Sequence, residues 1–302
     1  MVNGLKISKY APFLGMAFML LIVQLIAISL SKPLDDNDFK AFQDPEAASN
    51  VVYWIAIILV FTAFILLVVK LNKKWLIRAF IMISIAWTLM FVFYAAFSMF
   101  LSPVMNSVLT PVLSISLTLI LYKFPEWYVI DLVGVLIGAG AASIFGISLA
   151  IIPALLLLIL LAVYDYIAVY RTKHMIALAE GVMELRLPIL LVVPKRWSYS
   201  FINETFDKEE REAFFMGLGD AVMPTILVVS AITFSSAVNY TIPVLGAINL
   251  PAIGAIIGTF AGFSVLMGFV MKGNPQAGLP FLNGGVILGY AAGSMLAGAP
   301  LF

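Results

Sequence analysis

The sequence predicts an all-α polytopic membrane protein with nine transmembrane helices. Hydrophobic residues make up 63% of the 302 residues, charged residues make up only 11%, and the mean hydropathy is +1.09. A soluble globular domain would carry about a quarter charged residues. The apolar residues also fall into nine long runs, and the length of these runs indicates membrane-spanning helices rather than the elements of a soluble core.

Each apolar run has about the 20 residues that a membrane-spanning helix needs. As helices, the runs satisfy their backbone hydrogen bonds internally. The predicted spans are residues 10–31, 51–71, 76–100, 103–122, 128–147, 149–170, 213–236, 246–270 and 279–299. The first span follows Lys6 and Lys9, as in a signal peptide, but its apolar core is too long and it lacks a clear cleavage site. We therefore expect it to be retained.

Two longer polar stretches organise the chain. Residues 32–50 are rich in acid, and residues 171–212 are amphipathic at first and then strongly charged. The second stretch separates six predicted helices from three. We therefore divide the chain into an N-terminal part (1–170), a cytoplasmic loop (171–212) and a C-terminal part (213–302).

The distribution of lysine and arginine predicts the orientation in the membrane. Cytoplasmic loops carry the excess of these residues. With the N-terminus inside and nine crossings, only Lys32 and Lys40 of the 17 basic residues fall outside, which leaves 15 inside. We therefore expect a cytoplasmic N-terminus and an external C-terminus.

Composition gives no reason to expect a nucleic acid, a metal or a cofactor. The net charge is only +1, and the chain contains no cysteine, which excludes disulfides, thiolate metal sites and a cysteine nucleophile. The single histidine, His174, lies beside Lys173 next to a loop and is interpreted as a solvated surface residue. A zinc site would need more ligands than this.

Two aspartates in neighbouring spans are predicted to lie at similar depth. Asp165 precedes Arg171 by six residues, or about 9 Å of helix, and Asp220 follows Glu212 by eight, or about 12 Å. The sixth and seventh spans run in opposite directions, so both carboxylates belong to the cytoplasmic third of the bilayer. Charged side chains at such depth are costly and usually mark a function.

A third aspartate, Asp131, is interpreted differently. It follows Glu126 by five residues and lies next to Trp127 and Tyr128. Aromatic residues are enriched at the membrane interface. We therefore read Asp131 as an interfacial carboxylate rather than as a catalytic group.

A pair of close carboxylates has the equipment for peptide hydrolysis. Both cannot ionise readily, so the pair can hold a single shared proton. The charged member then takes a proton from an attacking water, and the protonated member donates to the carbonyl oxygen. The alternative is a transporter or channel in which the aspartates carry protons or ions across the membrane. Spacing and depth alone do not separate the two functions.

The residues around Asp220 favour a close approach by another backbone. Gly217 and Gly219 remove side chains around Asp220. Pro224 lacks the N–H that would bond the carbonyl of Asp220 in a regular helix. Two further glycine ridges with a spacing of four are assigned to helix packing, namely Gly254, Gly258 and Gly262, and Gly285, Gly289 and Gly293.

Three short motifs resemble the signatures of the presenilin and signal peptide peptidase family of intramembrane aspartyl proteases. They are Tyr164-Asp165, Gly217-Leu218-Gly219-Asp220 and Ala277-Gly278-Leu279-Pro280. The nine-helix layout is similar too, and among prokaryotic members the chain looks most like the archaeal presenilin homologue. The third motif departs from the family's Pro-Ala-Leu at Ala277 and Gly278. Pro280 suits the first turn of a helix.

The resemblance implies functions for the motif residues. Asp165 and Asp220 would be the catalytic pair, and the substrate-binding residues would be Tyr164, Gly217, Leu218, Gly219, Ala277, Gly278, Leu279 and Pro280. The substrate would be a transmembrane helix in the bilayer, of type I in the predicted orientation. Residues 171–212 would lie across the site as a gate.

Two other classes of membrane protein fit this sequence less well. A secondary transporter is expected to show pseudo-symmetric halves with broken helices in corresponding positions, and the sequence shows none. A prepilin-type peptidase also uses a GxGD aspartate, but it usually has fewer helices and its other aspartate lies outside the apolar span.

Overall fold

A computed structural model describes residues 11–70, 74–172, 190–196, 199–202, 212–271 and 276–301. Its helices are α1 (Ala11–Asp36), α2 (Ser49–Lys70), α3 (Lys74–Ser98), α4 (Pro103–Lys123), α5 (Trp127–Gly146), α6 (Ile151–Ile167), α8 (Leu218–Phe234), α9 (Leu250–Val270) and α10 (Leu279–Ala297). A π-helical turn, η1 (Ala168–Thr172), continues α6. The strands are β1 (Leu190–Pro194), β2 (Ala213–Gly217), β3 (Tyr240–Ile242) and β4 (Gly246–Ile248).

In the described part of the chain, seven helices are long and apolar enough to cross a membrane. The other two predicted spans are also helical, but their apolar stretches are shorter: Ser49–Phe64 in α2, and the 17 residues of α8. All nine predicted spans therefore contain a helix, while seven meet the length and hydropathy expected of a crossing. Large apolar side chains exposed on the outer helices suit contact with lipid.

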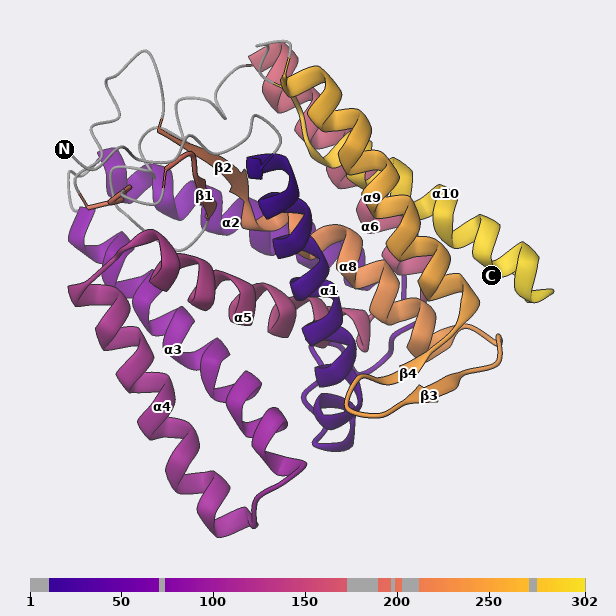
Figure 1. Ribbon diagram of the computed structural model, residues 1–302, viewed down its shortest axis with the longest axis horizontal. Coiled ribbons are helices and arrows are strands. Elements are labelled where there is room, and N and C mark those ends of the chain that lie inside the picture. The colour runs from indigo at the N-terminus through magenta and orange to yellow at the C-terminus, as the bar shows by residue number, and fades with distance from the viewer. Residues whose placement is uncertain are drawn as a thin grey trace.

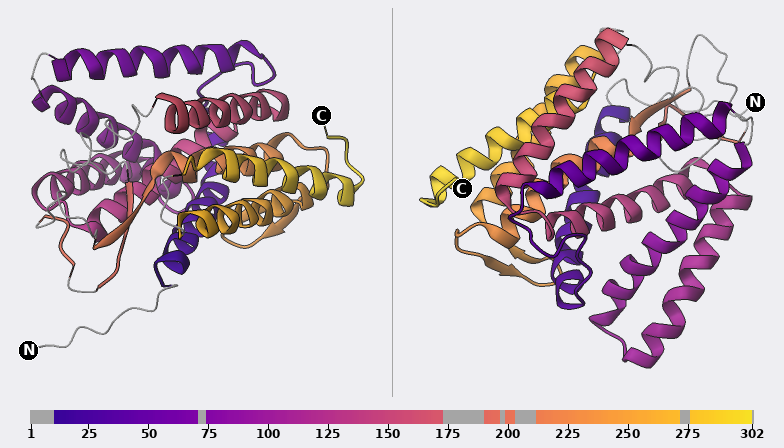
Figure 2. Two further views of the ribbon diagram at one scale, coloured as in Figure 1. Left: turned by 90° about the horizontal axis from the view of Figure 1, so that it is seen from above. Right: turned by 180° about the vertical axis from the view of Figure 1, so that it is seen from behind.

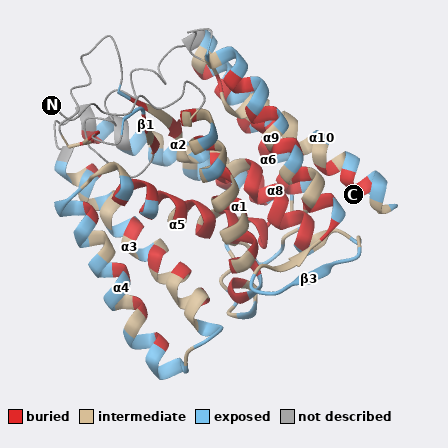
Figure 3. Cartoon of the chain, viewed as in Figure 1, coloured by how far each residue is buried: buried red, intermediate tan, exposed pale blue. Residues whose placement is uncertain are grey.

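The helices surround a central group made of α1, α5 and α8 (Figure 1). Helices α3 and α4 pack together on one side of this group, and α6, α9 and α10 lie on the other. Helix α2 lies on the outside, as the view from above shows (Figure 2). Figure 3 shows the buried residues concentrated along α5 and α8, while α3 and α4 expose their outer faces.

The start of two predicted spans is extended rather than helical. Residues 213–217, assigned to the seventh span, form β2, which pairs antiparallel with β1. Residues 246–248, assigned to the eighth, form β4, which pairs with β3. A short apolar run has no periodicity that separates a strand from a helix. The two sheets lie at opposite ends of α8 (Figure 1).

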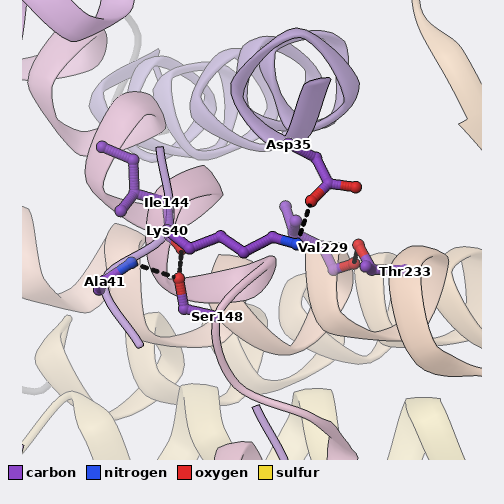
Figure 4. A network of polar contacts seen from close by, with 7 residues as sticks. All are labelled: Asp35, Lys40, Ala41, Ile144, Ser148, Val229 and Thr233. Carbon is purple, nitrogen blue, oxygen red and sulfur yellow. Dashed lines mark hydrogen bonds and ion pairs between the residues drawn. The ribbon is translucent and has the colours of Figure 1, made fainter. Parts of the chain in front are cut away.

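The polar stretch after α1 is tied to the end of α5 (Figure 4). Lys40 forms an ion pair with Asp35, with 2.8 Å between Nζ and Oδ1. The backbone N–H of Ala41 donates to Oγ of Ser148 at 2.7 Å, and that hydroxyl donates to the carbonyl of Ile144. These bonds hold the loop against the bundle at the side opposite the β1–β2 sheet.

Helices α9 and α10 are joined along an interlocked glycine seam. A Cβ atom at any seam glycine would overlap the backbone of the other helix; these glycines are Gly254, Gly258, Gly262, Gly285, Gly289 and Gly293. Their small size lets the two backbones touch, which is the principal source of attraction between helices in lipid. The assignment of both ridges to packing is confirmed.

Replacing Gly258 by alanine should destabilise the protein. The new Cβ would meet the carbonyl oxygen of Gly285, which belongs to a helix and cannot move alone. Overpacking of this kind costs about 1–3 kcal/mol. Thermal unfolding in detergent would measure the change. The control is Gly268→Ala, because nothing lies within 4 Å of a Cβ there. Equal midpoints for the two variants would contradict the seam.

Candidate functional site

The first carboxylate, Asp165, lies near the end of α6 and is only 4% exposed. Its Oδ2 atom accepts a hydrogen bond from the backbone N–H of Leu279 at 3.1 Å. Leu279 is the first residue of α10. The first N–H groups of a helix have no partner within the helix. The bond therefore gives the N–H of Leu279 an acceptor and at the same time holds the carboxylate of Asp165 in place.

The second carboxylate, Asp220, is the third residue of α8, whose N-cap is Gly217. A Cβ atom on Gly217 would lie 3.4 Å from Oδ2 of Asp220, so this side chain turns back toward the N-cap. The third helical position is where the carboxylate of a capping box lies. The sequence thus fixes this side chain locally, at the point where β2 becomes α8.

Gly278 brings the two carboxylates to one segment of backbone. A Cβ atom on Gly278 would lie 2.9 Å from Oδ1 of Asp220, while the next residue, Leu279, bonds Asp165. The two carboxyl groups are near enough that a charge on Asp165 would act on Asp220. Gly278 has φ −77°, so it is needed for space and not for an unusual backbone conformation. The structure thus brings together the two acids that the sequence placed at one depth.

Three contacts fix α6 and its continuation against the start of α10. Between the two helices, besides the Asp165–Leu279 bond, the amide of Asn283 donates to the carbonyl of Leu158 at 2.9 Å. On the other side, the hydroxyl of Tyr170 in η1 donates to Oε1 of Gln276 at 2.6 Å. The contacts follow one another in antiparallel order, so they set the register of the two helices. Asn283 is fully buried, and sequence reasoning missed it because its partner is 125 residues away.

Asp131, which the sequence indicated as an interfacial carboxylate, is buried within the protein and anchors β1. It is 3% exposed, and its Oδ1 atom accepts a hydrogen bond from the backbone N–H of Val192 at 2.7 Å. Nearby, Glu126 at the start of α5 accepts from Oγ of Ser200 and from the N–H of Phe201. Sequence reasoning missed the bond between Asp131 and Val192 because the two residues lie 61 positions apart in the chain.

The remaining predicted site residues have different surroundings. Tyr164 is 43% exposed, and Ala277 is buried. Leu218 packs where a Cβ on Gly138 would lie, whereas a Cβ on Gly219 would meet nothing within 4 Å.

The sequence predicts a helix start at Pro280 and a gate formed by residues 171–212. Pro280 lies in the first turn of α10, as predicted. Of the predicted gate, 171–212, residues 173–189, 197–198 and 203–211 lie outside the described residues; His174 is among them. Its described part includes β1, which pairs with β2 just ahead of Asp220.

Comparisons with known proteins agree on one family. Residues 16–299 match the family described as "Signal-peptide peptidase, presenilin aspartyl protease". A solved structure of a presenilin family intramembrane aspartate protease in space group C222 is 42% identical, with a TM-score of 0.73, and the match covers 95% of this chain and 100% of that chain. Another, in space group P2, is 41% identical, with a TM-score of 0.71 and coverage of 96% and 100%.

A search of curated proteins found no match. The transporter reading is not supported by the family match or by the solved structures, which are proteases. The chain therefore belongs to the signal peptide peptidase and presenilin family and is an intramembrane aspartyl protease.

Proposed function

We propose that Asp165 and Asp220 are the two catalytic groups of this protease. The observation that carries the proposal is that the backbone at Gly278 and Leu279 contacts both carboxyl groups, one through a hydrogen bond and the other through the space that glycine leaves. Two acids held to one short segment can act on one water and one peptide bond. The family of the chain supports the same assignment.

The pair would hydrolyse a peptide bond by general acid–base catalysis. One carboxylate takes a proton from water as the water oxygen attacks the carbonyl carbon, and the protonated acid donates to the carbonyl oxygen. The tetrahedral intermediate then collapses, and the leaving nitrogen receives a proton. No metal or cofactor is required for these steps.

The substrate would be a transmembrane helix that unwinds at the site. A helix in the membrane satisfies its own backbone groups, and unwinding leaves them without partners. An extended peptide recovers such bonds by pairing with protein backbone. The β1–β2 sheet leads directly into Asp220, and the backbone around Leu279 lies at Asp165. Both support recognition of an extended substrate segment.

Asparagine variants test the catalytic pair. Asp165→Asn and Asp220→Asn should each lower the rate of cleavage by about 10²–10⁴-fold, since each loses a proton donor or acceptor. The double variant should be little worse, because groups that act as a unit are not additive. The measurement is incubation of purified protein with a single-pass substrate, followed by mass spectrometry of the products.

The same assay in the wild type should give a bell-shaped dependence on pH. At low pH both carboxyls are protonated and the base is lost, and at high pH both are ionised and the acid is lost. A hydroxyl-bearing mimic of the tetrahedral intermediate should bind the wild type and bind each variant much more weakly. Full cleavage by purified Asp220→Asn protein would overturn the assignment.

A larger side chain at Gly278 should displace Asp220 and slow cleavage. A misplacement of about 1 Å at a catalytic group can cost about 100-fold in rate. We therefore expect Gly278→Val to lose about 10–100-fold and Gly278→Ala to lose less. Gly284→Ala is the matched control, because nothing lies within 4 Å of a Cβ at that position of α10. Normal turnover in Gly278→Val would show that this contact does not matter.

We also propose a cytoplasmic N-terminus, an external C-terminus and a preference for type I substrates. The charge asymmetry supports the orientation, since 15 of the 17 basic residues fall on one side. The chain has no native cysteine, so a cysteine introduced at residue 3 reports its own side of the membrane. An impermeant thiol reagent added outside should leave it unlabelled in intact cells, and external labelling would reverse the orientation.

A further inference from the structure

We propose that Asp131 is a positioning residue for the protease site, which acts by fixing β1 and closing the outer edge of that strand. This inference rests on the proposed function, because it concerns how the site places its substrate. Asp131 is the buried acid that the catalytic mechanism does not use. Asp131 is a residue of α5, and α5 packs directly against β1.

The pairing of β1 with β2 shows which backbone groups of β1 face outward. In an antiparallel pair, the N–H and C=O of one residue point to the same side, and the side alternates along the strand. Lys195 donates its N–H toward the β2 side, to the carbonyl of Glu212. Leu191 and Val193 therefore also face β2, whereas Leu190, Val192 and Pro194 face away from it.

After Leu190, which begins the strand, no outward residue of β1 offers an N–H to another strand. The N–H of Val192 donates to Oδ1 of Asp131, and Pro194 has no N–H. An unpaired strand edge normally invites pairing with another chain, and a covering helix is one way to prevent it. Here α5 covers the edge, and Asp131 satisfies the donor that the helix would otherwise leave buried. From Val192 to Pro194, the edge of β1 that faces α5 therefore offers no N–H to an incoming substrate strand.

The same bond connects α5 to the site through two strands. Val192 pairs with Phe215, and two residues earlier Leu190 pairs with Gly217, the N-cap of α8. Asp131 thus holds β1 at one height along α5. The position of β1 along α5 sets the position of β2, and therefore the position of Asp220, which follows β2 in the chain. A shift of β1 would change which bond of an extended substrate lies between the two catalytic acids.

The second oxygen of Asp131 distinguishes a backbone anchor from a member of an ionic network. Among the described residues, Oδ2 has no hydrogen-bond partner. One acceptor atom is therefore all that β1 requires. Asparagine keeps that atom, while leucine has a similar size and removes it.

The test compares Asp131→Asn with Asp131→Leu in the full-length protein. We expect Asp131→Asn to keep the wild-type set of cleavage positions on a single-pass substrate. Asp131→Leu should move a substantial share of the cuts to neighbouring peptide bonds and lower kcat about tenfold. The control is Glu126→Ala, which removes the bonds to Ser200 and Phe201 but keeps the bond to Val192.

A second measurement needs no activity. Hydrogen exchange at the Val192 amide should be at least tenfold faster in Asp131→Leu than in Asp131→Asn. If Asp131→Leu does not fold, Asp131→Ala replaces it, since its smaller side chain admits water to the Val192 N–H. Unchanged cleavage positions in the folded variant that lacks the acceptor, or unchanged exchange at Val192, would overturn the inference. Absence of cleavage by the wild type would instead refute the proposed function and leave the exchange result standing.

Discussion

Two helix N-termini converge on the two aspartates, and the site depends on this convergence. At the start of α10, the backbone N–H of Leu279 donates to Asp165, and Asp220 lies in the first turn of α8. The first N–H groups of a helix have no partner within the helix. The helix dipole also favours negative charge at this end. The carboxylates and the helix ends therefore stabilise each other, and the neighbouring contacts serve to hold the two ends together.

Much of this arrangement could be predicted from the sequence because it follows from helical geometry. The depth of Asp165 and Asp220 came from a rise per residue and from the alternation of helix direction. The glycine ridges were assigned to packing from their spacing, and Pro280 marked the start of α10. Each of these features is local, or repeats with a fixed period along one helix.

The features that could not be predicted depend on partners far apart in the chain. The apolar run that forms β2 was assigned to a helix because five residues show no distinguishing period. It is a strand because β1 is there to pair with it. Asp131 looked interfacial beside Trp127, and only the fold brings Val192 to it. Asn283 gave no signal at all, since its acceptor is a backbone carbonyl of another helix.

The glycine seam between α9 and α10 also limits how this part of the chain can evolve. At each of the six positions even the smallest added side chain would meet backbone atoms of the facing helix. A compensating change of a neighbouring side chain cannot relieve such a collision, because no side chain is involved. Substitution of a single one of these glycines is therefore not neutral. The sequence of this interface can diverge only if the two helices move apart along their whole length. Sequence variation in this region should accumulate instead on the faces that α9 and α10 turn toward lipid.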